Sequence, residues 1–186
     1  DHHLGTITQY EKLTKDVLRF EVKLPEEITF HAGQFFVLQV PGVEGFRAYS
    51  MVNYAPSSNK LEFIIKQFPG GKLSDWVFES DRSNDEIEVF GPLGRATFHP
   101  DESKDLFMIA GGSGIAGLMS ILEHGSQVNH FKNHRASLYF GVRTPQDMFF
   151  ADRLQAIKAK FPNNISINIA FSIEPPTEEQ LAGADG

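Results

Sequence analysis

A cluster of glycines at residues 111–117 constrains the fold of this chain more than any other feature. It follows a short apolar run, residues 105–110, that predicts a buried strand, and it precedes a segment in which apolar residues recur at helical spacing. Gly112, Gly114 and Gly117 form a Gly-x-Gly-x-x-Gly pattern between that strand and that helix. This is the context in which glycines let backbone N–H groups approach the phosphates of a dinucleotide.

The chain after the glycine cluster alternates between strand and helix. Residues 136–141 predict a second strand, residues 151–161 a second helix and residues 165–171 a third strand. This order predicts an α/β, doubly wound parallel sheet with right-handed connections, a Rossmann-like unit. We assign residues 101–186 to this unit and expect the tail from residue 174 onward to be loop.

The first hundred residues have a different rhythm. Apolar and polar residues alternate in short runs separated by Pro, Gly, Ser and Asn, which is typical of an all-β antiparallel barrel. The predicted strands cover residues 18–24, 34–40, 61–66 and 86–90, and one helix is predicted over residues 72–79. We assign residues 1–100 to this barrel.

Composition and charge exclude several classes of function. The net charge of −7 argues against a nucleic-acid-binding protein. The absence of cysteine excludes disulfides, a cysteine nucleophile and a cysteine-ligated iron–sulfur cluster within this chain, and it favours a cytoplasmic protein. The uncharged residues 106–122 approach a membrane span in length, but the glycines in their middle favour a strand, a loop and a helix over a span. His130 and His134 have metal-ligand spacing without a third ligand, so we expect solvated surface histidines and no metal site.

Two further motifs precede the glycine cluster. Arg47, Tyr49 and Ser50 stand between predicted strands, and they combine a forked cation for a diphosphate, a flat ring and a short hydroxyl. About twenty residues later, residues 70–74 read Gly-Gly-Lys-Leu-Ser at the start of the predicted helix, where free N–H groups favour phosphate. The order of these motifs predicts that one chain binds two nucleotides.

In this order and with these gaps, the motifs resemble those of the ferredoxin–NADP reductase superfamily. The similarity is greatest to the cytochrome b5 reductases and to the NADH reductase components of bacterial multicomponent oxygenases. Arg-x-Tyr-Ser at residues 47–50, Gly-x-x-Ser at residues 71–74 and Gly-Gly-Ser-Gly-Ile at residues 111–115 carry the resemblance. It implies an FAD-binding barrel followed by a nicotinamide-binding domain, with NADH, or else NADPH, as the reductant.

The resemblance also implies roles for individual residues. Arg47 would pair with the flavin diphosphate, Tyr49 would lie against the flavin, and Ser50 would act as the catalytic residue that hydrogen-bonds flavin N5. Further cofactor contacts are implied for Ala48, Met51, Val52, Asn53, Ile64, Lys66, Gly70, Gly71, Lys72, Leu73, Ser74, Gly112, Ser113, Gly114, Ile115 and Arg143.

The chain departs from the family in two places. Gly117 stands where relatives generally carry proline, and a Cys-Gly-Pro-x-x-Met segment near the flavin is absent. We therefore expect the nicotinamide domain to be incomplete within this chain. Arg143 is a candidate for contact with the cofactor ribose or a 2′-phosphate, and the nearby Asp147 favours NADH over NADPH.

The expected function is an FAD-dependent NADH reductase. Electrons would pass to a separate ferredoxin, iron–sulfur domain or haem protein, as in an oxygenase reductase component, and the protein would be a monomer. Two alternatives remain open. One is a free-standing flavin, quinone or ferric reductase of the same fold, and the other is a non-catalytic flavin- or nucleotide-binding module.

Overall fold

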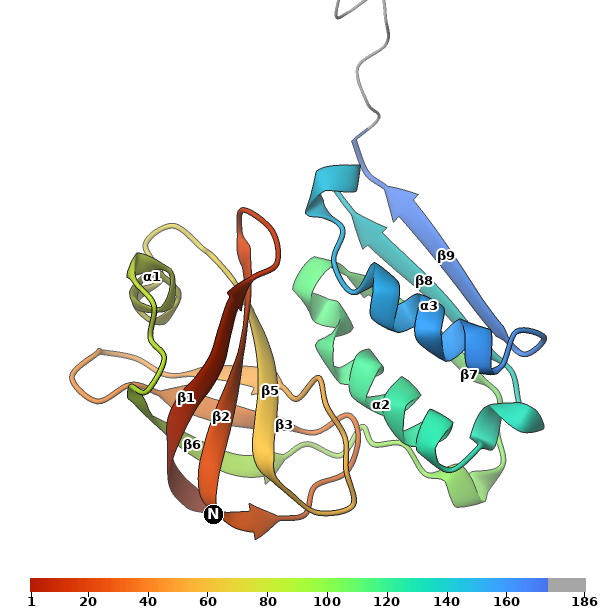
Figure 1. The fold of residues 1–186 in the computed structure, drawn as a ribbon, viewed down its shortest axis with the longest axis horizontal. Coiled ribbons are helices and arrows are strands. Elements are labelled where there is room, and N and C mark those ends of the chain that lie inside the picture. The colour runs from red at the N-terminus through yellow and green to blue at the C-terminus, as the bar shows by residue number, and fades with distance from the viewer. Residues whose placement is uncertain (174–186) are drawn as a thin grey trace, which may run out of the picture.

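The computed structural model describes residues 1–173, which form two sheets with the two longest helices packed between them (Figure 1). The first sheet contains β1 (His2–Lys12), β2 (Val17–Ile28), β3 (Phe35–Gln39), β4 (Arg47–Ser50), β5 (Ser58–Lys66) and β6 (Glu86–Leu93), with α1 (Lys72–Glu79) between β5 and β6. The second contains β7 (Leu106–Gly111), β8 (Ala136–Val142) and β9 (Ile165–Phe171), with α2 (Ala116–Gln127) and α3 (Ala151–Lys160). Short 3-10 helices are η1 (Pro100–Glu102), η2 (Gly112–Ile115), η3 (His130–Lys132) and η4 (Pro145–Asp147).

The first sheet is antiparallel and curls into a barrel, as the alternating sequence predicts. Its strand order is β4-β3-β6-β1-β2-β5, so β4 and β5 are the edges. The Val52 amide, just after β4, donates to the Glu62 carbonyl of β5 at 2.8 Å and ties the two edges together. Alternate side chains point inward, and the rings of Phe20, Phe36 and Phe63 are fully buried in this core.

Two strands of this sheet, β1 and the four-residue β4, lie outside the ranges predicted from the sequence. β1 is the longer of the two. Only Gly5 and Ile7 of its residues are buried, so it lacks a clear apolar alternation. It nevertheless pairs with both β2 and β6 in the middle of the sheet. Gly5 permits this pairing, because a Cβ there would lie 2.4 Å from Cγ1 of Val22 on β2. Neighbouring strands therefore decide the structure of this segment.

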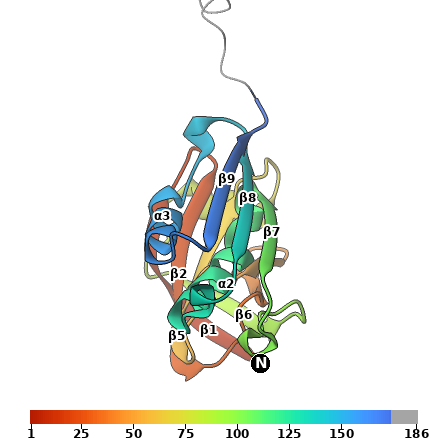
Figure 2. The ribbon, with the colours of Figure 1, turned by 90° about the vertical axis from the view of Figure 1, so that its right-hand side faces the viewer.

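The second sheet has the parallel order β7-β8-β9, as predicted from the alternation of strands and helices. Helices α2 and α3 cover the face that is turned toward the barrel (Figures 1 and 2). On the other face, Phe107, Ile109 and Tyr139 are exposed. The predicted tail, residues 174–186, lies outside the described residues.

We call β7–β9 with α2 and α3 the α/β unit. One apolar cluster joins this unit to the barrel. Val17, Val52 and Ile64 of the barrel side pack in the same buried cluster as residues of the helices and the parallel sheet. Hydrogen bonds reinforce the contact, because Ser120 Oγ and Gln127 Nε2 on α2 donate to the backbone carbonyls of Asn53 and Tyr54, each at 2.9 Å. Helix α2 is therefore docked on the segment that follows β4.

The expectation of a solvated His130 is wrong. The residue is 6% exposed, and its Nε2 lies 2.8 Å from the carbonyl oxygen of Lys104. Its ring stacks on His134 at 4.4 Å and meets Phe98 and Phe131 edge to face. A histidine ring presents an apolar body that packs well once its nitrogen finds a partner. No helix within residues 1–173 combines the length and the hydropathy needed to cross a bilayer.

Candidate functional site

A groove of about 510 Å³ opens on the barrel between β4, the loop before it and the start of α1. We call it the barrel groove. It is lined by Glu44, Gly45, Phe46, Arg47, Ala48, Tyr49, Phe68, Gly70, Gly71, Lys72, Leu73 and Ser74. The two motifs that stand about twenty residues apart in the sequence therefore share one groove.

The β4 residues differ in how far they reach into this groove. Arg47 is exposed, and its Nη1 donates only to the carbonyl of Phe46, at 3.1 Å, among the described residues. Tyr49 is half-buried, and its burial raises the pKa of its hydroxyl, although the Arg47 charge opposes this shift. Ser50 ends the strand and faces α2. β4 thus presents a free cation and a neutral phenol along the groove.

The start of α1 lines the same groove. Gly70 adopts a positive φ of 84°, and Gly71 caps the helix without any side-chain hydrogen bond to the first turn. The Ser74 hydroxyl instead holds the loop, because it lies within 3.3 Å of the amide and carbonyl of Phe68. The amides of Lys72 and Leu73 are in the first turn, where no intrahelical acceptor exists. The groove therefore contains a helix N-terminus suited to an anion.

The residues after β4 serve the barrel more than the groove. Met51 and Val52 are 1% and 0% exposed, and their amides are bonded to the carbonyls of Gln34 and Glu62. The Asn53 side chain accepts from the Glu62 amide and donates to the Lys60 carbonyl, each at 2.9 Å. The amides of Met51 and Val52 and the side chain of Asn53 are therefore committed to the barrel.

A second groove, of about 500 Å³, lies between the barrel and the carboxyl ends of the parallel strands. We call it the interdomain cleft. The barrel wall is Asp16, Val17, Lys66 and Phe68; the facing wall is Gly111, Gly112, Ser113, Gly141, Val142, Arg143, Asp147, Phe149 and Ser172. Ligands of open α/β sheets bind at this edge. Ile64, on the same face of β5 as Lys66, is buried in the apolar cluster and lines neither groove.

The glycine loop leaves its backbone accessible. Gly112 has a positive φ of 51°, and a Cβ at Gly112 or at Gly114 would meet no atom within 4 Å. Ile115 caps α2 without a side-chain hydrogen bond, and its own side chain is fully buried in the apolar cluster. Ser113 lies at the cleft between them. The loop therefore offers an open approach to the N-terminus of α2, as its pattern predicts.

The end of β8 brings opposite charges to the cleft. Asp147 accepts hydrogen bonds from the Thr144 hydroxyl at 2.8 Å and from the Thr144 amide at 3.1 Å. The hydroxyl bond lowers the pKa of Asp147 most, with smaller contributions from Lys15 and Arg143. The ionised carboxylate and the exposed Arg143 guanidinium both line the cleft.

Phe68 is a site residue that the sequence reasoning missed. Its ring is 63% exposed, and it lines both the barrel groove and the interdomain cleft. Lys66 Nζ lies 6.0 Å from the centre of the ring. An aromatic residue directly before Pro69 and the two glycines was the available sign, since an exposed aromatic in a loop often contacts a ligand.

Comparison with known proteins agrees with this arrangement. The oxidoreductase FAD-binding domain family matches residues 5–98, and the oxidoreductase NAD-binding domain family matches residues 108–183. The reductase component of propane 2-monooxygenase from Rhodococcus jostii is 32% identical over 97% of this chain and 49% of its own length. The ferredoxin–NAD(P)+ reductase component of the Pseudomonas putida naphthalene 1,2-dioxygenase system is 34% identical over 96% of this chain and 53% of its own.

The fold comparison points the same way. The crystal structure of an Amycolatopsis cytochrome P450 reductase superposes with a TM-score of 0.86 at 30% identity, covering 95% of this chain and 53% of that one. The chain thus spans about half the length of the relatives it matches. An FAD-binding barrel followed by an NAD-binding α/β unit places it in the oxidoreductase FAD-binding domain family, within the ferredoxin–NADP reductase superfamily.

Proposed function

We propose that this protein is an FAD-dependent NADH reductase that delivers electrons to a separate redox protein. One observation carries the proposal: the exposed Arg47 side chain and the N-terminus of α1, which has no side-chain cap, line the same barrel groove. A cation and helix N-terminal amides in one groove fit the diphosphate of FAD. FAD, when bound, supplies a ring that takes hydride from a nicotinamide and releases electrons singly.

The residues of the barrel groove bind and orient this cofactor in the proposal. Arg47 and the amides of Lys72 and Leu73 hold the diphosphate, and Gly70 and Gly71 let the backbone approach it. Ala48 and Tyr49 support the flavin, with the Tyr49 hydroxyl kept neutral by burial. The remaining contacts come from Ser74 and from the backbone of Met51, Val52 and Asn53.

Ser50 is the proposed catalytic residue. Its hydroxyl stands at the end of β4, against the first turn of α2, where the barrel meets the α/β unit. A hydroxyl both donates and accepts, so it suits a ring nitrogen whose protonation changes during the reaction. Ser50 would hold a hydrogen bond to flavin N5 in both states.

The interdomain cleft would hold the nicotinamide dinucleotide. Gly112, Ser113 and Gly114 offer backbone groups to its phosphates, while Ile115 supports the loop from the core. Lys66 and Phe68 form the opposite wall, with the buried Ile64 behind them. Bringing two rings together in a shaped cleft is the main contribution that a protein makes to hydride transfer.

Asp147 and Arg143 favour NADH over NADPH. The carboxylate of Asp147 is ionised and lies beside Arg143 at the same cleft, which opposes an added 2′-phosphate. NADPH is the second candidate reductant, because Arg143 is exposed and can pair with phosphate.

The electron acceptor is proposed from the relatives. Their names describe reductase components of oxygenase systems, and one is named as a ferredoxin–NAD(P)+ reductase. A ferredoxin, an iron–sulfur domain or a haem protein is accordingly the proposed partner. The proposal further includes a division into an FAD domain at residues 1–100 and a nicotinamide domain at residues 101–186, a monomeric state and a cytoplasmic location.

The first experiment is an absorbance spectrum of the purified chain, before and after anaerobic addition of NADH. The proposal expects a flavin band that bleaches with NADH. A flavin band that persists would instead indicate a non-catalytic flavin-binding module. Absence of the band even after FAD is added would refute the roles of Arg47, Tyr49 and Ser50. If the band bleaches, a panel of ferredoxin, quinone and ferric acceptors separates an oxygenase-type reductase from a free-standing one.

A further inference from the structure

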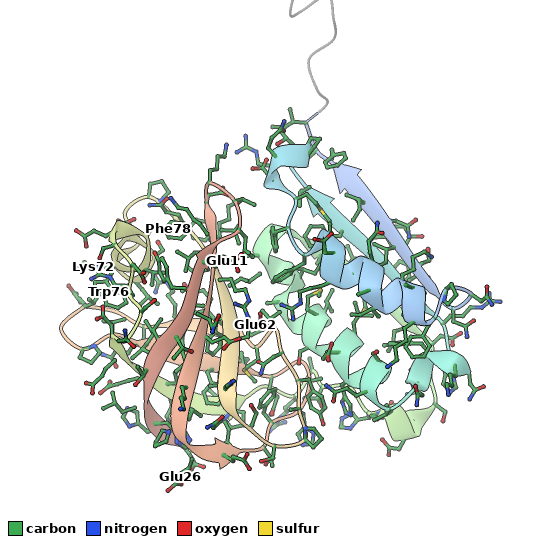
Figure 3. The ribbon with its side chains drawn as sticks, viewed as in Figure 1. Glu11, Glu26, Glu62, Lys72, Trp76 and Phe78 are labelled. Carbon is green, nitrogen blue, oxygen red and sulfur yellow. The ribbon has the colours of Figure 1, made fainter. Side chains whose placement is uncertain are left out.

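Glu62 is a buried carboxylate on the side of the barrel that faces the α/β unit (Figure 3). Only 4% of the residue is exposed. Side chains alternate along a strand, so Glu62, Ile64 and Lys66 share one face of β5. A buried charge requires partners that compensate its lost hydration. The partners of Glu62 come from both sides of the contact between the barrel and the α/β unit, which we call the seam.

Arg153, on α3, holds Glu62 from the α/β unit. Its Nη1 lies 2.7 Å from Glu62 Oε2, and its Nη2 lies 3.1 Å from Oε1, so the pair is bidentate. Arg19, on β2, donates to the same carboxylate from within the barrel and also to Glu21 at 2.8 Å. Within residues 1–173, the Arg153–Glu62 pair is the one salt bridge that crosses from the barrel to the α/β unit.

The contact between the barrel and the α/β unit is hollowed beside this pair. A groove of about 670 Å³ lies there, lined by Glu11, Leu13, Arg19, Glu62 and the residues from Met148 to Arg153. Both helices contribute to the buried apolar cluster, α3 through Leu154 and Ile157, but only α2 adds the hydrogen bonds from Ser120 and Gln127 to the barrel backbone. The fork of Arg153 therefore spans a hollow part of the seam and ties α3 to β5 directly.

Residues close in sequence to Glu62 and to Arg153 line the interdomain cleft. Lys66, on the cleft, is four residues along β5 from Glu62, which corresponds to about 13 Å of strand. On the other side, Phe149 lines the cleft just before α3, and the Arg153 guanidinium lies 4.7 Å from the ring centre of Phe150. A change at the pair would thus be transmitted to both walls through one strand and one short turn.

We propose that Arg153 and Glu62 are positioning residues, which hold α3 against β5 and so set the width of the interdomain cleft. Neither residue lines the cleft, and they act on the dinucleotide only through its walls. A bidentate Arg–carboxylate pair suits this role, because its planar fork restricts orientation as well as distance. The identity of the cleft ligand rests on the function proposed above, whereas the fixed orientation of the two units does not.

The test measures the distance between the units directly. The chain has no cysteine, so a cysteine pair replacing the exposed Glu26 on β2 and Gln155 on α3 carries spin labels at those two positions alone. In Arg153→Ala, Glu62 keeps Arg19 as its partner, so the barrel is expected to remain folded. Lys158→Ala is the matched control, because it removes a cation from the same helix. Lys158 bonds only within the α/β unit among the described residues, where its Nζ donates to the Ile165 carbonyl at 2.7 Å.

The expected result is one narrow distance distribution for the parent and for Lys158→Ala, and a broader distribution with a longer mean for Arg153→Ala. Arg153→Lys keeps the charge without the fork and is expected to fall between them. If Arg153→Ala does not fold, the distance distribution of Arg153→Lys is compared with that of the parent instead. Identical distributions for the parent, Arg153→Lys and any folded Arg153→Ala would overturn the proposal.

A second measurement connects the pair to the ligand. NAD+ is titrated into the FAD-loaded chain and followed through the flavin spectrum. Arg153→Ala is expected to weaken NAD+ binding by about tenfold, within the range typical of coupling between sites, and to leave FAD affinity unchanged. Unchanged NAD+ affinity alongside a broadened distance would refute the link to the cleft. If the parent binds no FAD, the proposed function fails, while the distance measurement still decides whether the pair fixes the two units.

Discussion

Gly117, in the first turn of α2, lies directly against Ser50 at the end of β4. A Cβ added to Gly117 would be 3.5 Å from both Cβ and Oγ of Ser50, and 3.9 Å from Cα of Gly33. The α/β unit therefore contacts the barrel at the residue proposed to contact flavin N5. The size of residue 117 controls the space available to the Ser50 hydroxyl.

Replacing Gly117 by alanine should stabilise the protein without disturbing this contact. A distance of 3.5 Å is ordinary van der Waals contact, and alanine favours helix over glycine by about 0.5–1 kcal/mol. Urea unfolding should show an increase of up to this size in the free energy of unfolding. Gly117→Leu is the contrasting variant, because its longer side chain must displace Ser50. It should slow flavin reduction by NADH, and equal reduction rates in the two variants would contradict a role for this contact.

Arg47→Ala should weaken FAD binding while the protein stays folded. The Arg47 side chain is exposed and bonds only its neighbour's carbonyl among the described residues, so its loss leaves no buried group unpaired. A charged hydrogen bond to phosphate contributes about 1.5–3 kcal/mol, which corresponds to a loss of affinity of roughly ten- to a hundredfold. Fluorescence titration with FAD measures it. Arg135→Ala, at the opposite end of the parallel sheet from the cleft, should bind FAD like the parent.

Asp147→Asn should shift the reductant preference toward NADPH. Asparagine keeps an acceptor for the Thr144 hydroxyl but removes the negative charge beside Arg143. An exposed charge interaction is worth about 0.2–1 kcal/mol, so the ratio of kcat/KM for NADPH over NADH should rise by a few-fold. Above about pH 7, where the 2′-phosphate of NADPH is fully ionised, the ratio in the parent should not vary with pH, since Asp147 has a lowered pKa and stays ionised there. Asp152→Asn, on exposed α3 surface, is the charge-matched control.

Stability should fall as the pH drops below about 6.5, because of His124. Its ring stacks on Tyr54 at 3.9 Å, and its Nδ1 is buried without a hydrogen-bond partner among the described residues. Burial lowers the pKa of His124 below its ordinary value of 6.5, and His31 and His130 lower it further. Between these two pKa values the unfolded chain binds a proton that the folded chain does not, so acid favours unfolding.

His124→Phe keeps an aromatic ring on Tyr54 and removes this titration. Urea unfolding between pH 5 and 8 gives the free energy of unfolding of parent and variant at each pH. The two plots of this free energy against pH should be parallel above the ordinary histidine pKa of about 6.5, and below it the parent should lose stability faster. Parallel curves over the whole range would show that His124 does not couple folding to pH.

Much of this protein is determined locally by its sequence. The glycine cluster between a strand and a helix, the alternation of residues 18–24 and the Arg-x-Tyr-Ser and Gly-x-x-Ser motifs each act within a few residues. Side-chain periodicity and turn chemistry depend on neighbours in the chain, so these short segments suffice to predict the barrel, the parallel sheet and the two glycine loops that we propose bind phosphate.

Other features depend on packing between distant segments. β1 is a strand because β2 and β6 flank it, and His130 is buried because Phe98 and Phe131 surround it. Phe68 belongs to two grooves only once the α/β unit lies beside the barrel. Arg153 and Glu62 are 91 residues apart, and nothing near either residue in the sequence predicts that the two form a pair. Contacts of this kind arise from the way two units bury their apolar faces together, and only the tertiary structure decides them.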